Sequence, residues 1–345
     1  MKKTSSITDI ANKLHISVTT VSFILNGKAE EKRISKALAE KVIKFAKAEG
    51  YVPNHLARSL RTGKTHILGL LVEDISNHFF ATIAAQIEDA ANAKGYRIFY
   101  CSSKNDTAKA KELLKVFEER KVDGYILTPV EGIQDRVQTL LDRNEKVVLF
   151  DRYFPEVETN YVVVDNESGA YEATKHLIDQ GFRDIAFITI KSKQTQMEGR
   201  LQGYRRALAE GGLRSHIKKV DFDVDTSTII REVKGYLASK KKIDAVFFAT
   251  NYLGVSGLEA IKNLGLTIPG DIGVVSFDDH DLFRLHSPAV TAVAQPIDKI
   301  AKSLIRILLD SIADSKDVKQ HVVIAPELIV RESSLKPVVS AISSI

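Results

Sequence analysis

The sequence has a single cysteine, Cys101, among 345 residues. One cysteine excludes an intramolecular disulfide and is typical of a reducing compartment, so we expect a cytoplasmic protein. Long apolar segments are also missing, because the longest clean apolar run covers only residues 67–72, far short of a membrane span. The two lysines near the N-terminus are not followed by an apolar core, which argues against a signal peptide. We therefore expect no membrane partner.

Motifs for catalysis and for cofactor binding are equally scarce. The glycines at positions 69, 124 and 199 are isolated and form neither a dinucleotide-binding pattern nor a P-loop. His78 has no neighbours at the spacing of metal ligands. The adjacent Asp278 and Asp279 could form a carboxylate pair, but no nucleophile or base partner accompanies them. We therefore expect a protein that is not an enzyme and that holds no metal or cofactor.

What the sequence does contain is an uneven distribution of charge. Residues 1–64 hold 13 Lys/Arg and 5 Asp/Glu, a net charge of +8, whereas the remainder carries a net charge of −3. A basic head on a slightly acidic body is typical of nucleic-acid-binding proteins, although a solvated lysine-rich helix would give the same count. The length favours two or three domains.

The head predicts two short helices around a tight turn. Ser6 and Asp9 have the spacing of a capping box, and apolar residues recur with helical period from there to Leu14. Ser17 is a suitable N-cap for a second helix over residues 18–25, which Asn26 and the following glycine would close. We expect the core side of this second helix to consist of Val21, Leu25 and also Ile24, and its outer side to consist of Val18, Thr19, Ser22 and Phe23. An outer side of this kind reads base edges in helix–turn–helix proteins.

Two further segments complete the head. A third helix is predicted over about residues 35–49, with a core stripe of Leu38, Val42, Phe45 and Ala46. After Pro53, residues 54–61 form a short helical pattern, which is marginal in water unless a second subunit and DNA stabilise it. Leu60 could then insert between base steps in the minor groove. A plain linker is the alternative interpretation of this segment.

Beyond the head, apolar runs typical of strands alternate with helical patterns. The strand-like runs cover residues 67–72, 96–101, 123–128, 146–150, 161–164, 184–189, 218–222, 244–249 and 271–277. The helical patterns between them cover residues 79–94, 107–120, 167–180, 197–210, 226–240 and 253–264. Continuous apolar strands separated by helices predict parallel sheets covered on both faces, here as two doubly wound halves. Two late segments, TAVAQ and QHVVIAPELIV, would complete the sheets and cross between the halves.

Polar residues follow several of these strands, where ligands bind in open α/β sheets. They are Asp74, Asp151, Asn251 and Asp278, with Phe79, Phe80 and Arg200 in the helices that come next. Carboxylates accept hydroxyl hydrogen bonds, a guanidinium donates a fork of them, and an aromatic ring can lie against a sugar ring. A single aspartate at a strand end is more often a helix cap, but several in one crevice predict a site for a sugar or polyol.

These segments together resemble the LacI/GalR family of bacterial repressors. The matching stretches are DIANKLHISVTTVSFILNG, GYVPNHLARSLRTGKT, ILGLLVEDISNHFF, FDR at 150–152, HLIDQGFRDIAFI at 176–188, GRLQGY at 199–204 and IPGDIGVVSFDD at 268–279. The resemblance covers nearly the whole chain. It implies a helix–turn–helix head on a periplasmic-binding-protein-like body, whose two subdomains are joined by three crossovers.

The resemblance also implies roles for individual residues. Val18 and Thr19 become the main base-reading pair, Asn26 a DNA-backbone contact and Leu60 the minor-groove lever. The expected DNA-binding residues are Thr8, Ser17, Val18, Thr19, Thr20, Ser22, Asn26, Asn54, His55, Ala57, Arg58 and Leu60. The expected effector-binding residues are Asp74, Phe79, Phe80, Asp151, Arg200, Asn251 and Asp278, with Arg200 as the effector clamp and Asp278 as the hydroxyl-binding acid.

The sequence departs from the common family pattern at three places. Phe23 stands where many members carry arginine, the loop of residues 28–35 is longer than usual, and Tyr252 follows Asn251 where aspartate is usual. The first two departures affect which operator sequence the head recognises. The third changes the edge of the ligand pocket. The operator sequence and the ligand therefore cannot be inferred from those of a relative.

We expect a homodimeric, sequence-specific transcriptional regulator that represses carbohydrate-utilisation genes and that binds a pseudo-palindromic operator in double-stranded DNA. A sugar-like effector in the cleft would control its affinity for the operator. The expected domains are a head of residues 1–62 and a body of residues 65–337, followed by a tail at 338–345. The body would divide into an N-subdomain (65–162 and 292–323) and a C-subdomain (163–291 and 324–337). The alternatives are a sugar-transport protein, which should have a signal peptide and no basic head, and an α/β enzyme.

Overall fold

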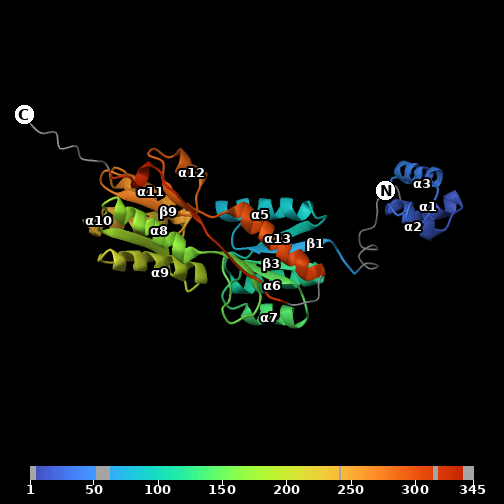
Figure 1. The fold of residues 1–345 in the computed structure, drawn as a ribbon, viewed down its shortest axis with the longest axis horizontal. Helices are drawn as coiled ribbons and strands as arrows, with labels where there is room; N and C mark the ends of the chain where they lie inside the picture. Colours follow the sequence, from blue (N-terminus) through green and yellow to red (C-terminus); the bar gives the residue numbers. More distant parts are fainter. Residues whose placement is uncertain (1–4, 52–62, 241, 314–317, 337–345) are drawn as a thin grey trace, which may run out of the picture. The chain divides into compact units, whose positions relative to one another are not determined.

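The computed structural model describes residues 5–51, 63–240, 242–313 and 318–336. The chain separates into two compact units, Met1–Thr65 and His66–Ile345, which we call the head and the body and describe one at a time (Figure 1). Within the described ranges, no helix is both long enough and apolar enough to cross a membrane.

The head is built from three helices, α1 (Ile7–Leu14), α2 (Val18–Leu25) and α3 (Lys36–Ala48). The predicted capping box is confirmed, because the N–H of Asp9 donates to the hydroxyl of Ser6 at 3.2 Å and the Asp9 carboxylate accepts from the Ser6 N–H at 2.8 Å. Ser17 caps α2 by accepting from the N–H of Thr20 at 3.0 Å. The first two helices therefore begin where local hydrogen-bond chemistry predicts.

The core of the head is small and includes the three residues of α2 that the sequence predicts. Val21 and Ile24 are buried, and Leu25 is half-buried and packs against this cluster. Residues three and four apart share a helix face, so these side chains lie on the side of α2 that faces the core. From α3, Val42 and Ala46 are buried, and Leu38 and Phe45 are partly buried around them.

The body contains two six-stranded sheets, as the sequence predicts. Their strand orders are β11-β5-β4-β3-β1-β2 and β12-β10-β9-β8-β6-β7, and the described pairings are parallel except that β12 runs antiparallel to β10. The strands are β1 (Ile67–Val72), β2 (Arg97–Ser102), β3 (Gly124–Leu127), β4 (Val147–Phe150), β5 (Asn160–Val164), β6 (Ile185–Ile190), β7 (His216–Val220), β8 (Ala245–Phe248), β9 (Gly273–Phe277), β10 (Thr291–Ala294), β11 (His321–Ile324) and β12 (Glu327–Ile329).

Helices cover both faces of each sheet (Figure 1). Helices α5 and α13 share an apolar core with one face of the first sheet, and α6 and α7 share another with its opposite face. In the second sheet α8 packs against α9, and α10 packs against α11. The helices are α5 (His78–Asn92), α6 (Thr107–Glu119), α7 (Gln134–Asp142), α8 (Asn166–Asp179), α9 (Thr195–Glu210), α10 (Thr226–Ser239), α11 (Asn251–Asn263), α12 (Asp281–Leu285) and α13 (Ile297–Ala313), with a short 3₁₀ helix, Glu332–Ser334.

Three helices were missed from the sequence: α7, α12 and α13. The longest of them, α13, buries Ile300, Ala301, Leu304, Ile305 and Leu308, and this spacing is the pattern of an amphipathic helix. The signal was therefore present in the sequence. Strand β7 also begins earlier than expected, at His216 rather than at residue 218.

One expected boundary between the subdomains is wrong. We expected the chain to return to the first subdomain at residue 292, but β10 pairs with β9 and β12 in the second sheet. The hydroxyl of Thr291 further holds β10 there, because it donates to the backbone oxygen of Arg331 at 2.9 Å. The chain passes between the sheets after β5, after β10 and after β11. These passages are the three crossovers.

A close contact between α8 and α9 leads to a stability prediction. A Cβ atom at Gly203 would lie 2.1 Å from the backbone oxygen of Glu167 and 2.8 Å from the backbone nitrogen of Tyr171, and neither backbone atom can move aside cheaply. We expect Gly203→Ala to lower the free energy of unfolding by about 1–3 kcal/mol, measured by chemical denaturation.

A matched control lies in α10. Gly235 is exposed, and a Cβ atom there would meet nothing within 4 Å. Gly235→Ala should therefore stabilise the protein by roughly 0.5–1 kcal/mol, because alanine loses less backbone entropy than glycine in a helix. A Gly203→Ala protein as stable as the parent chain would contradict the packing described for α8 and α9.

Candidate functional site

The head presents one polar face on α2. Val18 is 42% exposed and Thr19 is also exposed, so both side chains are accessible at the start of the helix. Ser17 and Thr20 are engaged in the cap, where their hydroxyl oxygens lie 2.8 Å apart. Thr8 is exposed in the first turn of α1. This arrangement leaves Val18 and Thr19 as the most available side chains of the predicted set on α2.

The far end of α2 is organised by its own hydrogen bonds. The side-chain amide of Asn26 donates to the backbone oxygen of Ser22 at 2.7 Å and to its hydroxyl at 3.3 Å. We expected Phe23 on the outer side, but its ring is half-buried and the ammonium of Lys32 lies 5.5 Å from the ring centroid. The long loop of residues 28–35 thus supplies the cation that covers this aromatic ring.

The remaining predicted DNA contacts fall outside the described residues. They belong to the hinge segment: Asn54, His55, Ala57, Arg58 and Leu60.

In the body, polar residues gather where parallel strands end. Asp74 follows β1, Asp151 follows β4, Asn251 follows β8 and Asp278 follows β9. The carboxyl ends of β1 and β4 border the cleft from the first subdomain, and those of β8 and β9 border it from the second. The structure therefore brings residues from both halves to one crevice, as expected for open α/β sheets.

Arg200 forms the polar centre of the second subdomain. Its guanidinium is 2% exposed and donates to the Asn166 side chain at 2.9 Å, to the Ala249 backbone oxygen at 2.6 Å and to the Asp278 carboxylate at 3.2 Å. The guanidinium carbon also lies 3.7 Å from the centroid of the Phe277 ring. Such a buried charge is stable only because it is paired and fully hydrogen-bonded.

Arg152, which the sequence places at the cleft directly after Asp151 but outside the expected effector-binding set, has the same role in the first subdomain. Its guanidinium is 3% exposed and donates to the Glu73 carboxylate at 2.7 Å and to the Pro129 backbone oxygen at 2.7 Å. It also reaches across the cleft, donating to the side-chain oxygen of Gln194 at 3.0 Å. The signal for this residue was its place directly after a buried strand.

Asp151 is the least compensated carboxylate of the cleft. Its side chain is 8% exposed, with Arg152 at 3.7 Å and the amide nitrogen of Gln196 at 3.4 Å as its neighbours. Burial raises the pKa of Asp151 to about 6, and the charges of Arg152 and Arg200 only partly oppose that rise. Oε1 of Gln196 is itself buried without a hydrogen-bond partner in the described part of the chain.

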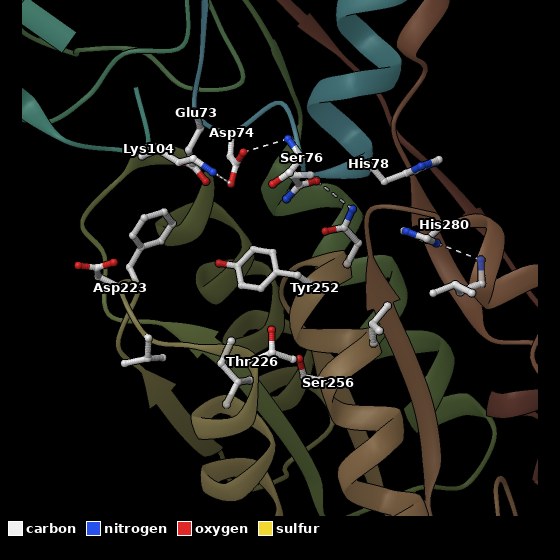
Figure 2. Close-up of a pocket in the computed structure, with 17 residues that line it drawn as sticks. Glu73, Asp74, Ser76, His78, Lys104, Asp223, Thr226, Tyr252, Ser256 and His280 are labelled. Carbon is white, nitrogen blue, oxygen red and sulfur yellow. Dashed lines mark hydrogen bonds and ion pairs between the residues drawn. The ribbon is translucent and has the colours of Figure 1, made fainter. Parts of the chain in front are cut away.

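The predicted effector residues line two adjoining compartments of the cleft. The inner compartment, about 30 Å³, is lined by residues that include Phe79, Phe80, Asp151, Arg200 and Asp278. The outer compartment, about 550 Å³, is lined by residues that include Asp74, His78, Lys104, Phe222, Asp223, Thr226, Asn251, Ser256 and His280 (Figure 2). Glu73, Asn77 and Tyr252 line both compartments, so the two adjoin at these residues.

The two compartments divide the predicted effector residues unequally. Five of the seven line the inner compartment, and only Asp74 and Asn251 line the larger outer one. The sequence analysis missed Phe222, Thr226 and Ser256, because the first lies just beyond a strand and the other two lie within helical patterns. Nothing in their local sequence marks them as pocket residues.

Side chains at the rim of the outer compartment bridge the two subdomains. The rings of His78 and His280 lie 4.4 Å apart between centroids, and the amide of Asn251 donates to that of Asn77 at 3.2 Å. Burial, with a further contribution from His78, lowers the pKa of His280. Among the described residues, no group of three or more His, Cys, Asp or Glu side chains could hold a metal ion.

Comparison with known proteins identifies the family. Residues 6–54 match the model of the bacterial regulatory proteins of the lacI family, and residues 174–334 match that of the periplasmic binding protein-like domain. The HTH-type transcriptional regulator RegA of Clostridium saccharobutylicum is 31% identical over 96% of this chain and 99% of the relative. The chain belongs to the LacI family. It is thus a DNA-binding transcriptional regulator, and the family resemblance seen in the sequence is confirmed.

Two further comparisons extend over the full LacI-family architecture. The HTH-type transcriptional repressor PurR of Vibrio campbellii is 30% identical over 96% of this chain and 99% of the relative. The solved structure titled transcriptional regulator CelR-cellobiose complex has a TM-score of 0.70 and 26% identity, covering 95% of this chain and 99% of that one. The LacI-family fold therefore includes both the head and the body.

The buried Asp151 predicts an unusual dependence of stability on pH. Its pKa of about 6 in the folded protein exceeds the value of about 3.9 in an unfolded chain, so the folded state holds its proton more tightly. This contribution to stability is present below about pH 4 and is lost as the pH rises through 6. Asp151→Asn should therefore be more stable than the parent protein at pH 7, by roughly 3 kcal/mol, and the difference should vanish towards pH 4.

The measurement is the free energy of unfolding of both proteins between pH 4 and pH 8. Asp179→Asn is the control, because Asp179 is exposed on α8 in an i,i+4 pair with Lys175 and should change stability by less than about 0.5 kcal/mol. An Asp151→Asn protein that is less stable than its parent at pH 7 would show that the carboxylate stabilises the cleft.

Proposed function

We propose that this LacI-family regulator is a repressor whose affinity for its operator is set by a sugar-like effector bound between the two subdomains. The observation that carries the proposal is a cavity of about 550 Å³ at the carboxyl ends of the strands, lined from both subdomains by hydroxyl, carboxylate and aromatic side chains. Relatives named as repressors, and a relative solved with cellobiose, support the same function. A regulator of this kind acts in the cytoplasm.

For the head, we propose that α2 enters the major groove of the operator. Val18 and Thr19 then contact base edges, because they are the accessible side chains of its first turn. Thr8, Ser17, Thr20, Ser22 and Asn26 hold the DNA backbone. The proposed roles of the hinge residues Asn54, His55, Ala57, Arg58 and Leu60 rest on the sequence alone.

For the body, we propose that the effector changes the contacts that now bridge the cleft. Gln194 is the residue that precedes α9 in the second subdomain, and its side chain is bonded to Arg152 at 3.0 Å and to Asn105 at 3.2 Å, both in the first subdomain. An effector that binds both walls has different affinities for arrangements in which these bonds are kept or broken. It thereby shifts the balance between subdomain arrangements, and with it the affinity for DNA.

Within the cleft, we propose that Arg200 and Asp278 bind one effector hydroxyl at the inner compartment. Arg200→Met should leave operator binding without effector within about threefold, because the head is unchanged. It should weaken the effector response by about 10–100-fold, since a hydrogen bond to a charged group contributes about 1.5–3 kcal/mol. The measurement is fluorescence anisotropy of an operator fragment with increasing effector concentration.

Arg206→Met is the matched control, because Arg206 lies on the same helix but is exposed and pairs with Glu167 at 2.5 Å. It should respond to the effector as the parent protein does. If Arg200→Met responded normally as well, Arg200 would not be part of the effector site. Arg200→Lys is a second control, for effects on folding, because it keeps a cation beside Asp278.

We also propose a homodimer that reads the two halves of a pseudo-palindromic operator. Exposed apolar side chains support it: Leu282 and Leu285 on α12 are 50% and 71% exposed, and Phe99 and Tyr100 are exposed on the edge strand β2. Apolar patches of this kind mark surfaces that are covered by a partner.

Leu285→Glu should therefore weaken dimerisation by at least about tenfold, because a carboxylate would have to be buried in the interface. Analytical ultracentrifugation measures the dissociation constant directly. Val323→Glu is the control, since Val323 is similarly exposed but lies on β11, at the opposite edge of the first sheet from β2. Equal effects of the two substitutions, or none from either, would place the dimer interface elsewhere.

A further inference from the structure

The sizes of the two compartments restrict the position of a ligand. The inner compartment has about 30 Å³ of free space, more than the roughly 10–15 Å³ that a cavity needs to hold one water molecule. It is far below the size of pockets that enclose whole ligands, so it suits a substituent of a ligand, such as a hydroxyl group, and not a sugar ring. The outer compartment has about 550 Å³, within the range of about 300–1,000 Å³ for pockets that enclose drug-sized ligands. The rings of an effector must therefore lie in the outer compartment, which has room for more than one.

Tyr252 borders both compartments. It lines both of them, and in Figure 2 its ring lies between Glu73, Asp74 and Lys104 on one side and Thr226 and Ser256 on the other. Burial raises the pKa of Tyr252, so its phenol stays neutral. A neutral aromatic ring beside hydroxyl side chains provides a surface for a sugar ring and partners for its hydroxyls.

The described lining of the outer compartment contains one lysine and no arginine, and that lysine is already paired. The ammonium of Lys104 is bonded to the Asp74 carboxylate at 2.7 Å. Burial alone would raise the pKa of Asp74, but the bonds from Lys104 and from the Ser76 N–H lower it overall. Asp223 at the rim is exposed and forms no ion pair within the described residues. An anion would have to displace Asp74 while lying near Asp223.

The inner compartment is equally unsuited to an anion. The Arg152 guanidinium is 2.7 Å from Glu73, and that of Arg200 is 3.2 Å from Asp278, so each cation already has a carboxylate partner. Over both compartments together, the acidic residues of the lining outnumber the lysine and arginine residues by two. A phosphate or carboxylate group entering this cleft would meet net repulsion and would lose its hydration without a free partner.

We propose that the effector is an uncharged sugar of at least two rings, and that sugar phosphates and sugar acids are excluded. This inference rests on the proposed function of the cleft and specifies the chemical class of its ligand. The rings lie against Tyr252 in the outer compartment, and one hydroxyl reaches the inner compartment.

The test is a thermal-shift screen of the full chain, followed by calorimetry. The neutral probes are cellobiose, maltose, trehalose, sucrose, melibiose and xylobiose. The affinity for each neutral probe is compared with the affinities for two sets of compounds. The anions are cellobionate, maltobionate, trehalose 6-phosphate and glucose 6-phosphate, and the single rings are glucose and xylose. We expect at least one neutral disaccharide to bind, and to bind at least about tenfold more tightly than its anionic counterpart and its component ring.

The outcomes separate this inference from the function on which it rests. An anionic sugar or a single ring that binds as tightly as any neutral disaccharide, and that changes operator affinity, overturns the inference and leaves the sugar-responsive repressor intact. If no compound of the panel binds or changes operator affinity, both the sugar effector and the inference are wrong.

A charge substitution tests the physical cause directly. Asp223→Lys should reduce the preference for the neutral over the anionic sugar by about threefold to fivefold, because it replaces an acid at the rim by a base. Asp221→Lys is the control, since Asp221 lies two residues away, pairs with Lys191 at 2.8 Å and does not line the compartment. An unchanged preference in Asp223→Lys, or the same change in both variants, would refute charge as the basis of selectivity.

Discussion

The cleft depends on two arginine side chains that are almost completely buried. Burial of a guanidinium is costly unless every donor finds a partner. Arg200 meets this requirement with Asn166 at the start of α8, with Ala249 beyond β8 and with Asp278 beyond β9. Because these partners lie on three separate segments, satisfying one side chain fixes where those segments end relative to one another. Arg152 does the same in the first subdomain and also bonds to Gln194 in the second.

This arrangement explains why the ligand space lies where it does. The arginines are satisfied by the protein itself, so the inner compartment is nearly closed and the open volume lies beyond Tyr252. The lining of the outer compartment therefore consists largely of polar uncharged, carboxylate and aromatic side chains. The bonds that cross the cleft are few and directional, which makes them suitable for a two-state element that a ligand can bias. The proposed function needs such an element, because it assigns the ligand and the DNA to different units of the chain.

The two subdomains use the same strand position for different purposes. Asp151 follows β4 and Asp278 follows β9, and each strand is third from the corresponding edge of its sheet. Both residues have a positive φ, 68° and 66°, a conformation that aspartate adopts more readily than most residues. Asp278 accepts from Arg200 and from Gln295 at 2.6 Å, whereas Asp151 has only distant partners and a raised pKa. Equivalent positions in the two sheets thus give one paired acid and one poorly compensated acid.

The sequence by itself determined the starts of the first two helices, most of the strands, the family and the polar residues at the strand ends. These depend on local chemistry: Ser6 and Ser17 cap helices within four residues, and apolar runs mark strands that are buried on both faces. Only the tertiary structure decided that β10 joins the second sheet, that Phe23 lies under Lys32, and that Arg152 bonds to Glu73 and Gln194. It also decided the volume available to a ligand. Each of these features depends on contacts between residues distant in sequence, or on how side chains pack, and neither periodicity nor spacing encodes such contacts.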